Sequence, residues 1–248
     1  MEWTDEAIIL SVKALGETAA VAEVFTRAHG RTLGLVHGGR SRRLRPVLQT
    51  GNHVDATWKA RLADQLGSLA LELRSPHAAH AMDDAARLAA LSSVTALLRL
   101  LPERDPHPGL YEVTQFVLGF LDDPTVWPAL MVRWEVALLA ELGFGLHLGA
   151  CAATGGNDQL IYVSPKSGRA VSASAGAPYA DRLLRLPGFL TAGRDSTVTP
   201  ADIRDGFVLT GYFLEHRVGA MLGAGLPEAR ARMLALIGPA AEAGSGAT

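Results

Sequence analysis

The chain has 248 residues, of which 48% are hydrophobic and 19% charged, and its formal net charge is −2 at pH 7. These values are typical of a folded globular protein and exclude binding to polyanions through total charge alone. The single cysteine, Cys151, excludes an internal disulfide and indicates a reducing, cytoplasmic environment. The acidic opening MEWTDEAIIL does not have the pattern of a secretory signal, and no apolar run approaches the ~18 residues of a membrane span, so we expect no membrane association.

The first 80 residues contain short apolar or alternating runs, separated by Gly, Asn and Asp, that predict β-strands. In VDATWKARL, Val54 and Trp58 fall on one face while Lys59 and Arg61 fall on the other, which is the period of a strand buried on one side. Five strands in so short a segment predict a small barrel or sandwich, and an OB-type barrel is the natural candidate. We expect the strands within residues 7–12, 20–30, 31–39, 52–62 and 67–75.

After Pro76 the apolar period becomes helical. The segment 83–102 has leucines at helical spacing, begins with Asp83 and Asp84 where the helix dipole favours negative charge, and ends at Pro102. The sequence therefore predicts an α+β fold, with a five-stranded OB-type barrel over residues 1–80 and a helical domain over residues 81–248. Within the second domain we expect helices in 109–123, 125–145, 178–186, 199–219 and 227–237, extended structure in 158–172, and a disordered tail at 240–248.

The stretch GLVHGGRSRR, residues 34–43, differs at Arg40 from the G-x-x-x-x-G-K-[ST] pattern of a nucleotide phosphate loop. Such a loop needs a following helix whose N-terminus faces the anion, whereas here Pro46 opposes a helix that begins at Ser41. The surrounding pattern is also that of β-hairpins. These features argue against nucleotide hydrolysis, and nothing in the sequence supports covalent or acid–base catalysis, so we expect no enzyme activity.

The same stretch belongs to a basic segment, because no acidic residue occurs between Glu23 and Asp55. One interpretation is that its arginines are only a solvated face, and another is that they contact a nucleic-acid backbone. Guanidinium groups match phosphate oxygens in a bidentate manner, which favours the second interpretation. The candidate DNA-binding residues are Arg31, Arg40, Arg42, Arg43 and Arg45, with Lys59 and Arg61 adding a second line on the outward face of their strand.

Five stretches, taken in order, carry a family resemblance: EWTDEAIILSVKALGETAAVAEVFTRAHGRTLGLVHGGRSR, LQTGNHVDATWKARL, RWEVALLAELGFGLHL, CAATG and YVSPKSGRAVS. Together they resemble RecO, the bacterial family of DNA repair and recombination mediators. The resemblance covers nearly the whole chain and is weakest from Thr191 onward. It implies an N-terminal OB-fold, a helical C-terminal domain and a small zinc-finger-like β insertion.

The resemblance also implies an activity and partners. Such a protein binds single- and double-stranded DNA, anneals complementary strands and helps RecR load RecA onto DNA coated by single-stranded DNA-binding protein (SSB). Its expected location is the cytoplasm, in association with the nucleoid. The helical domain would receive the acidic, carboxylate-ended tail of SSB, and Arg133 is the candidate contact; alternatively, Arg133 is merely solvated beside a buried Trp134.

The insertion, at about residues 147–173, departs from the family pattern. Many members hold zinc with four cysteines, of which the first two are spaced C-x-x-C. Here Cys151 matches the first position but Thr154 occupies the second, and adding His147 would still leave a tetrahedral site two ligands short. We therefore expect a degenerate insertion without metal or other cofactor. Its packing would depend on Leu160, Tyr162, Val163 and Val171.

Two rival functions remain open from the sequence. The first is a protein–protein adaptor whose barrel docks another protein and whose arginines are incidental, with no binding to DNA. The second is an enzyme with a phosphate site at Gly34–Ser41. Binding to DNA at two salt concentrations separates the adaptor from a DNA-binding mediator, because phosphate contacts make affinity depend on salt.

Overall fold

The computed structural model describes residues 1–62, 65–191, 197–223 and 225–243. Two compact units make up the chain, the first formed by Met1–Asp122 with Pro227–Leu234 and the second by Asp123–Leu226 with Ala235–Thr248. The helix α8 (Glu228–Ala243) contributes residues to both units. Among the described residues, no helix is long and apolar enough to cross a membrane.

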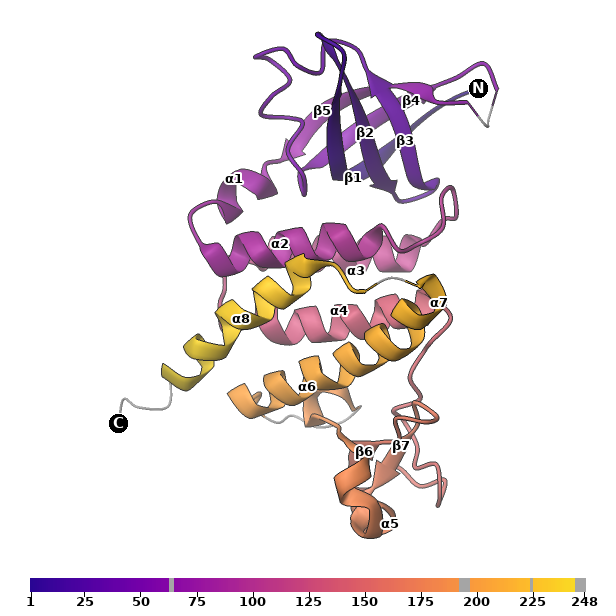
Figure 1. Cartoon of the computed structure of the whole chain (residues 1–248), viewed down its shortest axis with the longest axis vertical. Helices are drawn as coiled ribbons and strands as arrows, with labels where there is room; N and C mark the ends of the chain where they lie inside the picture. Colours follow the sequence, from indigo (N-terminus) through magenta and orange to yellow (C-terminus); the bar gives the residue numbers. More distant parts are fainter. Residues whose placement is uncertain (63–64, 192–196, 224, 244–248) are drawn as a thin grey trace. The chain divides into compact units, whose positions relative to one another are not determined.

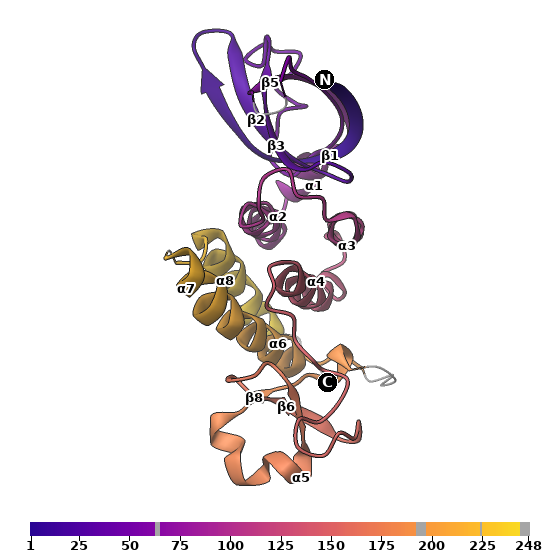
Figure 2. The ribbon, with the colours of Figure 1, turned by 90° about the vertical axis from the view of Figure 1, so that its right-hand side faces the viewer.

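Five strands form the N-terminal sheet, as the sequence predicts. They join in the order β1-β2-β3-β5-β4 and close on themselves through the antiparallel β1–β4 pair, which Figure 2 shows as a ring. The α+β class is confirmed, and this closed sheet is consistent with an OB-type domain. The strands are β1 (Glu2–Leu15), β2 (Ala19–Thr26), β3 (Gly30–Val36), β4 (His53–Lys59) and β5 (Gly67–Ser75).

The parallel β3–β5 seam is the short side of the closed sheet. Only Gly34↔Gly67 and Leu35↔Ser68 pair there, so the two strands separate beyond Leu35. Both glycines are required by close packing: a Cβ on Gly67 would lie 2.3 Å from the Trp58 ring, and one on Gly34 would lie 2.6 Å from the Leu69 Cβ. The separation leaves an opening along β5.

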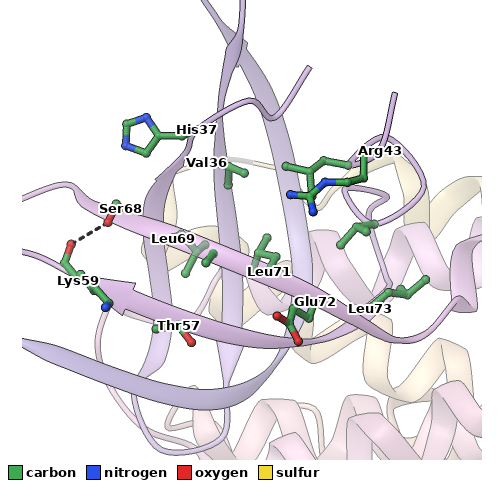
Figure 3. Close-up of a pocket in the computed structure, with 13 residues that line it drawn as sticks. Val36, His37, Arg43, Thr57, Lys59, Ser68, Leu69, Leu71, Glu72 and Leu73 are labelled. Atoms are coloured by element: carbon green, nitrogen blue, oxygen red, sulfur yellow. Dashed lines mark hydrogen bonds between the residues drawn. The ribbon is translucent and has the colours of Figure 1, made fainter. Parts of the chain in front are cut away.

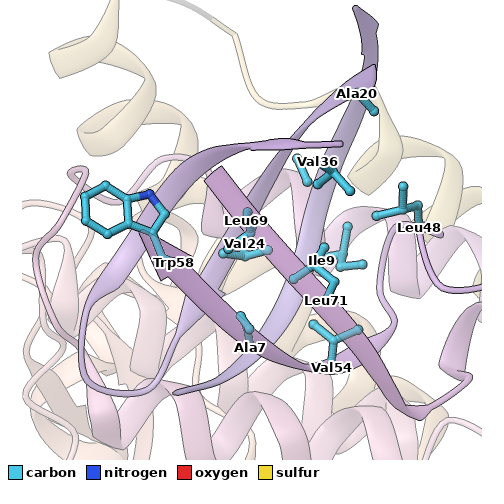
Figure 4. Packing of buried hydrophobic residues seen from close by; sticks show 12 residues of the cluster. Ala7, Ile9, Ala20, Val24, Val36, Leu48, Val54, Trp58, Leu69 and Leu71 are labelled. Carbon is cyan, nitrogen blue, oxygen red and sulfur yellow. The ribbon is translucent and has the colours of Figure 1, made fainter. Parts of the chain in front are cut away.

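The barrel core confirms the alternation read from the sequence. Val54, Ala56 and Trp58 of β4 are buried against the inward residues of the other strands (Figure 4). The Trp58 indole donates a hydrogen bond of 3.2 Å to the Leu33 carbonyl oxygen, so its one polar atom is satisfied inside. The core cluster comprises Ala7, Ile9, Ala20, Ala22, Val24, Val36, Leu48, Val54, Ala56, Trp58, Leu69 and Leu71.

Helices α1 (His77–Ala81), α2 (Ala85–Leu98) and α3 (Pro108–Gly119) follow the barrel in the first unit (Figure 1). The predicted start of α2 is confirmed, because the Asp84 carboxylate accepts a hydrogen bond of 2.8 Å from the Arg87 main-chain N–H as its N-cap. Helix α2 ends at Leu98, before the predicted Pro102, and packs against β1.

The second unit contains α4 (Trp127–Glu141), the short α5 (Ala173–Gly176) and α6 (Pro200–Phe213). Its three-stranded sheet has the order β7-β6-β8, with β6 (Leu160–Val163), β7 (Ala170–Ser172) and β8 (Leu184–Arg185). A π-helical turn, η3 (Leu214–Gly219), continues α6 and leads into α7 (Ala220–Leu222). Two 3-10 turns complete the unit, η1 (Ala177–Arg182) and η2 (Gly188–Leu190).

Three details differ from the expected elements. The segment 178–186, predicted as a helix, instead gives η1 and then β8, because Leu184 and Arg185 pair with β6. The single helix predicted over 199–219 changes to a π-helical turn after Phe213. Of the tail predicted to be disordered, residues 240–243 belong to α8, and residues 244–248 lie outside the described part of the chain.

Candidate nucleic-acid interface

A basic loop, residues 37–51, connects β3 to β4 and supplies most of the predicted cations. Its apolar residues fix it to the barrel, since Leu48 belongs to the core and Leu44 and Val47 pack against it. The arginines of the loop face outward. Arg40, Arg42, Arg43 and Arg45 are all exposed, and within the described residues none of the four forms an ion pair.

Arg40 anchors the start of the basic loop to the β1–β2 hairpin. Its main-chain N–H donates to the Thr18 carbonyl oxygen at 3.1 Å, and its guanidinium Nη1 donates to the Gly16 carbonyl oxygen at 2.8 Å. A guanidinium carries five N–H donors, so several remain available for an anion. The anchoring gives the loop a defined place beside the barrel.

A groove of about 530 Å³ lies where β3 and β5 separate, and we call it the barrel groove. Arg43 of the basic loop and Lys59 of β4 both line it, while Glu72 of β5 is the one acidic residue among the described residues of the lining (Figure 3). The remaining lining is largely aliphatic. The full lining is Val36, His37, Arg43, Leu44, Val47, Thr57, Lys59, Ser68, Leu69, Ala70, Leu71, Glu72 and Leu73.

Lys59 forms an ion pair with Glu2, at 2.7 Å between Nζ and the carboxylate oxygen. Both side chains are more than half exposed, so solvent screens the pair and it contributes little stability. Lys59 can therefore exchange Glu2 for a phosphate at small cost. Arg61, two residues further on, is also exposed and has no ion pair within the described residues, but it does not line the barrel groove.

Arg31 occupies a different environment from the other predicted cations. Its guanidinium forms an ion pair with Glu23 and donates from Nε to the Leu101 carbonyl oxygen at 2.9 Å, and only 15% of the side chain is exposed. Burial alone would raise the pKa of Glu23, but hydrogen bonds from Arg31 and Arg99 hold that pKa below its usual value. The geometry does not support Arg31 as a phosphate contact, because its charge is already neutralised inside the first unit.

The phosphate-loop alternative fails on main-chain geometry. The N–H groups of Gly39 and Ser41 donate to the Val36 and Gly38 carbonyl oxygens at 3.2 and 2.9 Å. The main-chain N–H of Arg40 is also occupied, as described above. These amides therefore point at the protein rather than at an anion, and the segment continues as turns instead of a helix.

The groove lacks the stacking platform that many single-strand binders use. Trp58 is buried, as predicted, and Trp3 is stacked between it and His29, with ring centroids 5.8 and 4.3 Å apart. His37 supplies the one ring among the described residues that line the groove. The site can thus contact a sugar–phosphate backbone through cations and leave the bases unread. Glu72 and His37 were not among the predicted site residues, although the alternation of β5 places Glu72 on its outward face.

The second unit holds a smaller pocket of about 320 Å³ beside the predicted Arg133. Arg133 is exposed on α4, donates from Nη2 to the Phe189 carbonyl oxygen at 2.7 Å and lies 5.9 Å from the Phe189 ring centroid. Val136 and Leu148 add apolar walls. Trp134, the neighbouring residue, is fully buried, as expected. The pocket pairs a cation with apolar surface, which suits a short acidic peptide with an apolar side chain.

Cys151 is buried at the base of the small sheet. The main-chain N–H of Ser172 donates to its Sγ at 3.3 Å, and burial, which alone would raise the pKa of Cys151, is outweighed by hydrogen bonds from Ser172 and Thr154 that lower it to about 6. The predicted packing of the sheet is confirmed, since Leu160, Tyr162, Val163 and Val171 are all buried. Among the described residues, no three His, Cys, Asp or Glu side chains gather as a metal site.

Comparison with known proteins gives matches over both units. Residues 1–76 match the family described as Recombination protein O N terminal, and residues 82–224 match Recombination protein O C terminal. The chain is 56% identical over 240 residues to the DNA repair protein RecO of Methylobacterium nodulans, covering 95% of this chain and 98% of that protein. It is 55% identical over 237 residues to the DNA repair protein RecO of Rhodospirillum centenum, covering 94% of each chain.

Proposed function

The chain belongs to the recombination protein O family of DNA repair proteins, and from this premise we propose that it binds single- and double-stranded DNA through the basic loop and the barrel groove. The observation that carries the proposal is the set of four exposed arginines on one anchored loop, none of which forms an ion pair within the described part of the chain, next to a groove that Arg43 and Lys59 line. Arg61 extends this surface, whereas Arg31 is left out because Glu23 neutralises it.

Such a surface would bind without reading sequence. Guanidinium and ammonium groups neutralise phosphates and release condensed counterions, so affinity should fall steeply as salt rises. The aliphatic groove floor offers nothing that distinguishes one base edge from another. Strand annealing then follows physically, because charge repulsion between two backbones is screened while their bases stay free to pair. This activity needs no catalysis, and we propose a mediator rather than an enzyme.

The test is to replace Arg42, Arg43 and Arg45 together with Ala and to measure both binding and annealing. All three side chains are exposed, so the fold should be unchanged by circular dichroism. We expect binding to single-stranded DNA to weaken at least tenfold at low salt, with a salt slope shallower by about 2, since each lost phosphate contact removes about 0.7. Unchanged annealing by a folded variant would move the DNA site elsewhere.

One observation favours a second candidate function, the adaptor without DNA binding. The groove walls include Leu44, Leu69 and Leu73, and Leu73 is 40% exposed, so an apolar segment of another protein could occupy them. Filter binding of the wild-type chain at two salt concentrations separates the candidates, because a pure adaptor retains no DNA at either concentration.

The proposed partners follow from the family and from the second pocket. We propose that the chain works with RecR in loading RecA onto SSB-coated DNA, in the cytoplasm and near the nucleoid. The Arg133 pocket supports a contact with the acidic SSB tail, because the arginine retains donors for a carboxylate beside apolar Val136 and Leu148. We further propose that the small sheet of the second unit is a zinc-finger-like insertion whose metal-binding role is lost.

A further inference from the structure

The second unit carries a group of cations that the proposed function does not use. The turn between β6 and β7 runs from Ser164 to Arg169 and exposes both Lys166 and Arg169. It is closed by two main-chain hydrogen bonds, from the Gly168 N–H to the Ser164 oxygen at 2.8 Å and from the Ser164 N–H to the Arg169 oxygen at 3.0 Å. The two cations are therefore held on one ordered turn.

A third cation reaches this turn from a distant part of the chain. Arg217 lies on η3, the π-helical turn, and its Nη2 donates to the Lys166 carbonyl oxygen at 2.6 Å. π-Helical turns are rare and frequently occur at functional sites, because the extra residue re-aims the side chains that follow. Arg217 retains further N–H donors after this contact. We call Lys166, Arg169 and Arg217 the turn patch.

The surroundings of the turn patch are open and include two histidines. His147 pairs with the turn through main-chain bonds of 2.9 Å to Gly168 and Ala170, and with Arg169 it lines a hollow of about 660 Å³. His216 is exposed on η3 and stacks on the Tyr212 ring, with centroids 4.2 Å apart. The hollow's other lining residues are Leu146, Leu148, Gly149 and Ala150.

The charge of the turn patch is not neutralised within the described residues. Neither Lys166 nor Arg169 nor Arg217 forms an ion pair there, unlike Arg27, Arg74 and Arg87 of the first unit, whose partners are carboxylates. Glu215 is the acidic neighbour on η3, and it is also exposed. Three exposed cations that form no ion pair within the described residues leave a surface that attracts anions.

We propose that the turn patch is a second phosphate-binding surface, which holds a nucleic-acid strand separate from the one on the basic loop. The inference rests on the proposed function for its role: annealing needs two strands on one protein, and the two units would each bring one. The ligand that fits this surface is a sugar–phosphate backbone. The cations suit its phosphates, and His147 and the apolar residues of the hollow lie beside Arg169, where they could contact sugars or bases.

The test counts how many strands one chain binds. Non-complementary oligonucleotides of about ten nucleotides, each short enough for one site, are mixed with the full chain and the number bound per chain is measured by sedimentation. We expect two for the wild type. The Lys166→Ala, Arg169→Ala double variant should bind one and anneal at least tenfold more slowly, while its affinity for a single oligonucleotide changes by less than about threefold.

The control removes two exposed cations elsewhere, by Arg204→Ala and Arg232→Ala. Arg204 lies 13 residues before Arg217 on the same helical run, or about 20 Å along its axis. This control should still bind two oligonucleotides. A wild-type count of one, or a count of two that survives loss of Lys166 and Arg169, would overturn the inference. The variant with Arg42, Arg43 and Arg45 replaced by Ala separates this inference from the proposed function. It should bind one oligonucleotide if both the basic loop and the turn patch bind DNA, and none if only the basic loop does.

Discussion

Arg31 of β3 and Glu23 of β2 form an ion pair that is almost withdrawn from solvent, with 15% and 4% of the two side chains exposed. Arg99, which directly follows α2, also pairs with Glu23, at 2.7 Å between Nε and the carboxylate oxygen. The buried Glu23 carboxylate is thus neutralised by two arginines inside the first unit. This arrangement predicts that Arg31 stabilises the first unit, and that the exposed arginines of the basic loop carry the proposed contact with DNA.

Replacing Arg31 with Ala should lower stability rather than DNA affinity. The substitution removes one of the two arginines that pair with buried Glu23 and leaves the Leu101 carbonyl oxygen without its donor, which should cost about 2 kcal/mol in the free energy of unfolding. Urea denaturation measures that loss, and anisotropy with a labelled single strand should show an unchanged salt slope. A folded Arg31→Ala variant with a clearly shallower salt slope would return Arg31 to the DNA surface.

Replacing Glu72 with Gln should strengthen DNA binding. Among the described residues that line the barrel groove, Glu72 is the one carboxylate, and it would repel a phosphate that approaches Arg43 and Lys59. We expect an affinity increase of about threefold at low salt that disappears at high salt, since the charges are exposed and screened. The matched control is Glu228→Gln, an exposed carboxylate on α8 that should change nothing. Equal affinity for wild type and Glu72→Gln would mean that DNA does not enter the groove.

Replacing Arg133 with Ala should weaken binding of an acidic peptide that ends in a free carboxylate. Arg133 is the cation of its pocket, so we expect a loss of about tenfold, measured by calorimetry. The same peptide with an amidated end should bind wild type more weakly and should be insensitive to the substitution. Arg204→Ala, on α6, is the control variant. If the free and amidated peptides bind equally well, the pocket does not recognise a carboxylate.

Stability of the first unit should fall as pH falls. His77 follows Pro76 and lines a cavity of about 310 Å³ with His80, Arg87 and Asp122. Burial, together with the neighbouring His53 and His80, lowers the pKa of His77 to about 4. The unfolded chain accepts a proton on His77 near pH 6.5, whereas the folded protein accepts it only near pH 4. The free energy of unfolding is therefore unaffected by His77 above pH 6.5 and decreases as pH falls from 6.5 toward 4.

The measurement is urea denaturation at pH 7.5 and pH 5. Between these two pH values, protonation of His77 in the unfolded chain should lower the free energy of unfolding by on the order of 2 kcal/mol, as its pKa shift implies. A His77→Gln variant, which cannot take up the proton, should lose less stability than wild type between the two pH values. Equal losses for the two proteins would show that His77 does not titrate in this range.

Local pattern was sufficient for the barrel strands and for the placement of the core. The alternation in VDATWKARL predicts that Trp58 is buried and Lys59 exposed, and both are found so, because side chains of a strand point to opposite faces whatever the remaining topology. Likewise, the acidic residues before α2 predict its start, since capping depends on neighbouring backbone groups alone. The helix predicted over 178–186 is wrong because the strand that pairs with this segment, β6, lies about twenty residues earlier in the chain.

The basic loop could also be predicted from composition, because a segment without Asp or Glu is evident from the sequence whatever its fold. The sequence could not predict which arginines of this basic segment are neutralised by ion pairs. Arg31 looks like its neighbours in sequence, yet Glu23 and the Leu101 carbonyl lie 8 and 70 residues away and meet it only when the first unit folds. The same holds for the turn patch, where Arg217 reaches Lys166 across 51 residues. Sequence determined which charges exist and which faces they occupy, and tertiary structure decided which are neutralised, because an ion pair depends on distance in space and not along the chain.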